Sequence, residues 1–65
     1  MSPEAISKQI GKLKDRYDVL EAKLPHARNI DEYDRIAHQL EIIGYQIEIL
    51  KAQRDLARME QAAGK

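Results

Sequence analysis

The chain has 65 residues, no cysteine, and equal numbers of basic and acidic side chains, 11 of each. This length holds one small domain, residues 1–65, which is marginal in stability unless disulfides, a metal or oligomerisation support it. The lack of cysteine excludes disulfides and thiolate metal sites and favours the cytoplasm. Balanced charge argues against strong binding to a phosphate backbone, which needs clustered lysine and arginine.

The apolar residues do not indicate a membrane protein. No apolar run approaches the about 18 residues that cross a bilayer. Helices that lie on a membrane surface usually combine many Lys and Arg residues with Trp or Phe, and this chain has neither Trp nor Phe. We therefore expect no membrane partner.

The first apolar stripe predicts a helix over about residues 3–24. Ser2 is a suitable N-cap, Pro3 suits the first helical position, and Glu4 favours the positive end of the helix dipole. Pro25 ends the helix because it lacks an N–H group and clashes with the preceding turn. The apolar side chains recur at alternating steps of four and three, the heptad spacing of a core-facing seam; they are Ile6, Ile10, Leu13, Tyr17, Leu20 and Leu24.

A short connection, about residues 25–29, leads into a longer second helix over about residues 30–62 that ends near Gly64. Asn29 followed three residues later by Glu32 has the pattern of a capping box. A connection this short makes the two helices antiparallel neighbours. The sequence therefore predicts an all-α fold, a two-helix antiparallel hairpin that packs like a coiled coil.

The second helix carries two apolar stripes. The inner stripe consists of Ile36, Leu40, Ile43, Ile47 and Leu50, and Arg54 and Ala57 continue it. The outer stripe consists of Ile42, Tyr45, Ile49, Ala52, Leu56 and Met59, and Ala63 continues it. Both alternate steps of four and three, but they lie about 150–210° apart around the helix at roughly 3.5 residues per turn. A helix that is apolar on two sides is expected to be sandwiched, with one partner from its own hairpin and one from elsewhere.

The unequal lengths of the two predicted helices also indicate that the outer stripe needs a partner from outside the hairpin. Folding back near the connection places Ile6 level with the region of Ile49, so that Leu56 and Met59 extend past the start of the first helix. The same register places Gly11 level with Gly44, which indicates either a close approach of two backbones or two unrelated surface glycines. The simplest way to bury the outer stripe is a two-fold dimer of hairpins, a four-helix bundle, or a larger helical assembly.

No catalytic, cofactor or metal site is predicted. There is no glycine-rich phosphate loop, and Ser2 and Ser7 are the only hydroxyl side chains besides tyrosine. His38 and Glu41 are three residues apart, but dinuclear carboxylate bundles use the opposite order and place glutamates in the core, where this chain has Ile and Leu. His38 is either a rim residue or a partly buried interface histidine whose protonation weakens assembly.

Arg54 is the one polar break in the inner stripe. It either fixes the register of the packed helices or lies at the end of the bundle, where its side chain reaches water. With Lys51 and Arg58 it forms a small basic cluster, which acidic neighbours offset; they are Glu48, Asp55 and Glu60.

These patterns favour a non-enzymatic protein–protein interaction module. We expect a small self-associating hairpin that acts as an adaptor, chaperone, inhibitor or structural subunit, and whose partner is itself, a larger protein, or both. The outer stripe is the expected partner interface. The alternative is a dimeric nucleic-acid-binding regulator that uses the basic cluster, and the neutral overall charge makes that alternative the weaker one.

Overall fold

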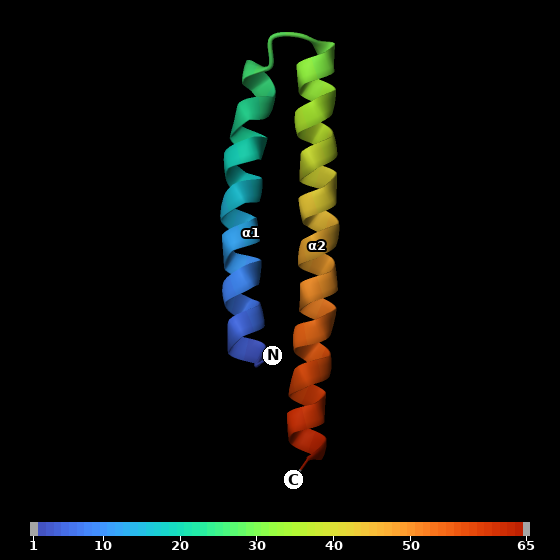
Figure 1. The fold of residues 1–65 in the computed structure, drawn as a ribbon. Coiled ribbons are helices and arrows are strands. Elements are labelled where there is room, and N and C mark those ends of the chain that lie inside the picture. The colour runs from blue at the N-terminus through green and yellow to red at the C-terminus, as the bar shows by residue number, and fades with distance from the viewer. Residues whose placement is uncertain (1, 65) are drawn as a thin grey trace.

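Two antiparallel helices form the whole of the fold in the computed structural model, which describes residues 2–64 (Figure 1). Helix α1 spans Pro3–Lys23, a single 3₁₀ turn η1 spans Leu24–His26, and helix α2 spans Ile30–Ala63. No strand occurs among residues 2–64. The Cα trace measures 55 × 14 × 13 Å, so the hairpin is a long, narrow rod.

Helix α1 begins where its capping residues predict. The Ser2 side-chain oxygen accepts a hydrogen bond from the Ala5 backbone N–H at 3.2 Å, and Pro3 occupies the first turn. The helix ends at Lys23, one residue before the predicted end, because Leu24 and Pro25 enter the 3₁₀ turn. Proline is tolerated there since the first N–H groups of a helical turn have no partner within it.

Helix α2 begins at a second side-chain cap. The Asn29 carboxamide oxygen accepts a hydrogen bond from the Glu32 N–H at 2.8 Å. The Glu32 carboxylate reaches back to the Arg28 N–H at 3.4 Å, one residue earlier than in the usual capping box. The helix runs to Ala63, and Gly64 caps it through its N–H to the Glu60 carbonyl at 2.9 Å.

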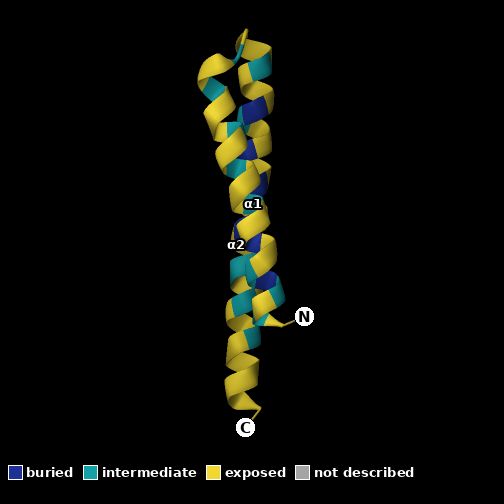
Figure 2. Ribbon diagram, turned by 90° about the vertical axis from the view of Figure 1, so that its left-hand side faces the viewer, coloured by how far each residue is buried: buried dark blue, intermediate teal, exposed yellow. Residues whose placement is uncertain are grey.

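The core lies along the line where the two helices meet (Figure 2). Ile6 and Ile10 of α1 form one buried cluster with Ile43 and Ile47 of α2. Four other predicted core residues are partly buried against this cluster; they are Leu13, Tyr17, Leu20 and Leu50. Ile36 and Leu40 are also buried, and Leu24 is half-buried in the 3₁₀ turn. No polar or charged side chain is buried among the described residues.

The C-terminal part of α2 extends past the start of α1 (Figure 1). Helix α2 has 34 residues and α1 has 21, so α1 cannot cover the whole of its neighbour. Apart from the half-buried Ala57, every residue from Asp55 to Gly64 is exposed. Leu56 and Met59 belong to this uncovered end.

The two mid-helix glycines do not mark a close approach of the backbones. A Cβ atom added to Gly11 or Gly44 would meet no neighbouring atom within 4 Å. Neither glycine has a positive φ, so neither backbone conformation requires glycine. Of the two interpretations that the register allowed, the structure supports unrelated surface glycines.

Candidate protein-interaction surface

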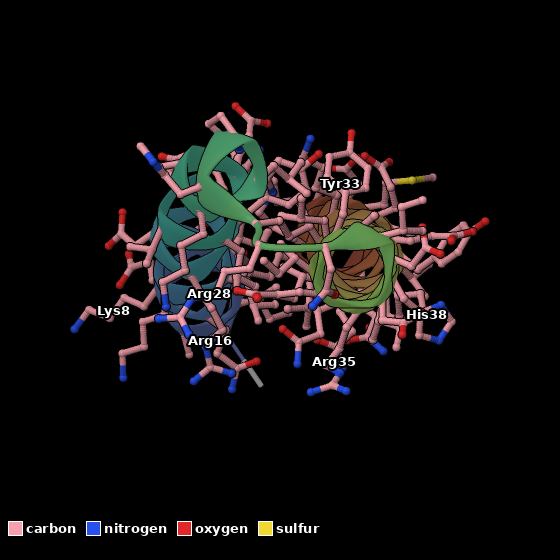
Figure 3. All side chains as sticks on the ribbon, turned by 90° about the horizontal axis from the view of Figure 1, so that it is seen from above. Lys8, Arg16, Arg28, Tyr33, Arg35 and His38 are labelled. Carbon is pink, nitrogen blue, oxygen red and sulfur yellow. The ribbon has the colours of Figure 1, made fainter. Side chains whose placement is uncertain are left out.

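The outer stripe lies on the side of α2 that faces away from α1. His38 marks this side in the view along the hairpin axis (Figure 3), and Tyr45 and Ala52 follow it at steps of seven residues on the same face. All six residues of the stripe are exposed. The exposed fractions of its five large side chains range from 44% for Ile42 to 68% for Met59.

The arrangement of these exposed side chains in one row distinguishes the outer stripe from ordinary surface residues. Scattered single apolar residues are normal on a protein surface, whereas a continuous row of them indicates a binding surface. Val19 on α1 is 56% exposed and belongs to no such row. The stripe extends from Ile42 to Met59, about 26 Å at 1.5 Å per residue.

Two polar rows flank the outer stripe, and inspection of the apolar residues alone misses them. The acidic row consists of Glu41, Glu48 and Asp55, and the glutamine row consists of Gln39, Gln46 and Gln53. Each row repeats every seven residues and all six side chains are exposed. These are the positions that border the seam of a coiled coil, where side chains decide which partner is accepted and in which orientation. Counting heptads outward from the stripe would have identified both rows.

Each member of the acidic row makes a polar contact within α2. The Tyr45 hydroxyl donates a hydrogen bond to the Glu41 carboxylate at 3.3 Å, which holds the polar tip of the ring at the edge of the stripe. Lys51 Nζ lies 3.7 Å from Glu48 Oε1, and Arg54 Nε lies 3.7 Å from Asp55 Oδ1. Such exposed pairs contribute little to stability, but they place a cation beside two of the three acids.

Arg54 continues the inner stripe as a half-buried residue with a side chain that is 25% exposed. Its Nε atom is buried, and no hydrogen-bond acceptor within the described residues meets it. The 3.7 Å separation from Asp55 is an ion pair but is too long for a hydrogen bond. The partly exposed side chain is consistent with a guanidinium that reaches water from the end of the core.

Shallow grooves lie beside the junction of the two helices. One of them is lined by residues of both helices; they are Arg16, Leu20, Gln39, Ile42, Ile43 and Gln46. Ile42 is also the least exposed large residue of the outer stripe.

His38 is exposed and lies on the same side of α2 as the outer stripe (Figure 3). Within residues 2–64, no three His, Asp or Glu side chains come together in a way that could hold a metal ion. In the same part of the chain, neither helix is both long and apolar enough to cross a membrane.

Comparison of this chain with protein-family models, with curated proteins and with solved structures gives no match. The function proposed for the chain therefore rests on the geometry of the hairpin alone.

Proposed function

We propose that this protein is a non-enzymatic protein–protein interaction module, a helical hairpin that self-associates through the outer stripe of α2. The observation that supports the proposal is the continuous apolar row on the side of α2 that α1 leaves uncovered. An adaptor, chaperone, inhibitor or structural subunit could each be built on such a hairpin. The cytoplasm, expected from the lack of cysteine, is the proposed compartment.

The free energy available from covering the stripe is substantial. Complete burial of a large aliphatic side chain contributes about 1.5–3 kcal/mol. Because the five large side chains of the stripe are on average somewhat more than half exposed, their burial offers about 4–8 kcal/mol per copy. Losses of translational and side-chain freedom oppose association by a comparable amount. We therefore expect an assembly that dissociates on dilution.

A second copy is the simplest partner. Since the stripe faces away from α1, two copies related by a two-fold axis would pack α2 against α2 and leave each α1 on the outside. This arrangement contains four helices and gives each α2 a helix on both sides. Both apolar stripes of α2 are then covered without a second kind of protein.

The test is the solution mass of a double variant, Ile49→Glu with Leu56→Glu. Two carboxylates within the stripe would have to lose their hydration in the assembly, which costs far more than the lost apolar contact. In sedimentation equilibrium, we expect the unmodified chain to be a dimer or larger assembly and the double variant to be a monomer. Circular dichroism should show that the double variant keeps its helices, because both residues are exposed in the single hairpin.

The matched control is Val19→Glu. Val19 is as exposed as Ile49 and Leu56 but lies on α1, outside the stripe, so its mass should equal that of the unmodified chain. A monomeric unmodified chain at high concentration, or an unchanged mass of the double variant, would contradict self-association through the outer stripe.

The alternative, a nucleic-acid-binding regulator, receives no support from the basic cluster. Lys51 lies beside Glu48 and Arg54 lies beside Asp55, each at 3.7 Å. The acids offset the charge that a phosphate backbone would need to meet.

A further inference from the structure

We infer that the two copies meet with their α2 helices antiparallel, in a register that places Ile49 of each copy against Ala52 of the other. This inference rests on the proposed self-association and specifies its geometry. In this geometry, a second copy of this chain covers the outer stripe. The order of side-chain sizes along the stripe favours this register.

The antiparallel register pairs every member of the stripe with a member of the other copy. Because the two helices run in opposite directions, one step along the first helix is matched by one step back along the second. The resulting layers are Ile49 with Ala52, Tyr45 with Leu56, and Ile42 with Met59, and the two-fold axis repeats each of them. The smallest residue of the stripe thus always lies opposite a β-branched one, which fills the space that alanine leaves.

The parallel alternative packs less well. There each residue meets its own equivalent, so Ala52 lies opposite Ala52 near the middle of the seam and leaves a void between the helices. The antiparallel arrangement also places the dipoles of the two helices in opposite directions, which is the more favourable alignment.

The flanking rows do not decide between the antiparallel and parallel directions. In the antiparallel arrangement, Gln46 of one copy borders Gln53 of the other, and two carboxamides can exchange hydrogen bonds. Glu48 then borders Asp55 across the opposite edge, where Lys51 and Arg54 already lie beside these acids. The parallel arrangement separates Glu48 from Asp55 but places Asp55 of one copy beside Glu60 of the other. Like-charge contacts therefore do not favour either direction, and the packing of the stripe decides.

Disulfide trapping tests the register directly, because the natural chain contains no cysteine. The two single variants are Ile42→Cys and Met59→Cys, both at exposed positions near the ends of the stripe. In the antiparallel register, residue 42 of one copy lies opposite residue 59 of the other. Two copies of residue 42 are then separated by about 26 Å, whereas a disulfide needs Cα atoms within about 7 Å.

We expect an oxidised equimolar mixture of the two variants to form the mixed disulfide in about tenfold excess over either homodisulfide. Homodisulfides should form only by random collision, because like positions are too far apart within the dimer. Val19→Cys, mixed with each variant in turn, reports the level of disulfide that arises from random collision. Circular dichroism of the reduced variants confirms that their helices are intact.

The possible outcomes separate the two proposals. Efficient homodisulfides of Ile42→Cys would overturn the antiparallel orientation and leave self-association standing. A chain that is dimeric by sedimentation but gives disulfides only at the collision level would overturn the register. A chain that stays monomeric by sedimentation would overturn the proposed function itself.

Discussion

Arg54 shows how one residue can lower the stability of a short core. Its stem continues the inner stripe beyond Leu50, and its buried Nε atom meets no acceptor among the described residues. A buried polar group without a hydrogen bond costs about 1–3 kcal/mol. The ion pair with the exposed Asp55 offsets only a small part of this cost.

We predict that Arg54→Met stabilises the hairpin by about 1 kcal/mol, since methionine keeps the apolar stem and removes the unsatisfied Nε. Urea unfolding at a fixed protein concentration measures the change. Arg58→Met is the control, because Arg58 is exposed and its replacement should change stability by less than about 0.5 kcal/mol. A loss of stability in Arg54→Met alone would instead support the interpretation that Arg54 fixes the register of the packed helices.

At the scale of the element, the start of α2 depends on one short hydrogen bond. Asn29 follows the connection directly, and its side chain satisfies the Glu32 N–H at 2.8 Å. The cap hydrogen bond of α1 is longer, 3.2 Å from the Ala5 N–H to the Ser2 side-chain oxygen, and is therefore the weaker of the two.

We therefore predict that Asn29→Ala destabilises the hairpin by about 1 kcal/mol, and that Ser2→Ala has a smaller effect. Asn29→Asp should keep most of the stability, because a carboxylate accepts the same hydrogen bond and favours the positive end of the helix dipole. Thermal unfolding followed by circular dichroism compares the three variants. An Asn29→Ala variant as stable as the unmodified chain would show that the cap contributes nothing.

Local rules predict most of these elements correctly. The side-chain caps locate the start of both helices, and the heptad spacing identifies the inner stripe, whose members from Ile36 to Ile47 are all buried. The end of α1 differs by one residue, because the chain turns into a 3₁₀ helix at Leu24 before the connection. Such a turn depends on how the chain must bend to bring α2 alongside, which no local pattern contains.

The glycines and the flanking rows show where sequence reasoning fails. The expected register places Gly11 level with Gly44, but a Cβ atom added to either residue would meet nothing within 4 Å, so the packing of the helices does not require glycine there. The acidic and glutamine rows are polar, so a search for apolar periodicity does not detect them. Their significance appears only once the outer stripe is known to be exposed and to need a partner.

At the scale of the whole molecule, the hairpin has one apolar seam that it can bury alone and one that it cannot. The inner stripe packs on α1, while the outer stripe remains in water along much of the rod. A two-helix unit of this size has little stability to spare. If a second copy covers the outer stripe, folding and association become coupled, and the stability of the chain depends on its concentration.

This coupling predicts a melting temperature that rises with protein concentration. A tenfold increase in concentration favours a dimer by about 1.4 kcal/mol, or about 0.7 kcal/mol per chain. Since 1 kcal/mol shifts the melting temperature of a domain this small by about 4–8 °C, we expect a rise of about 3–6 °C per tenfold increase. Circular dichroism in cells of different path length measures it. Val19→Glu should keep the slope and Ile49→Glu with Leu56→Glu should remove it, whereas a flat response of the unmodified chain over a hundredfold range would mean that its outer stripe stays in water.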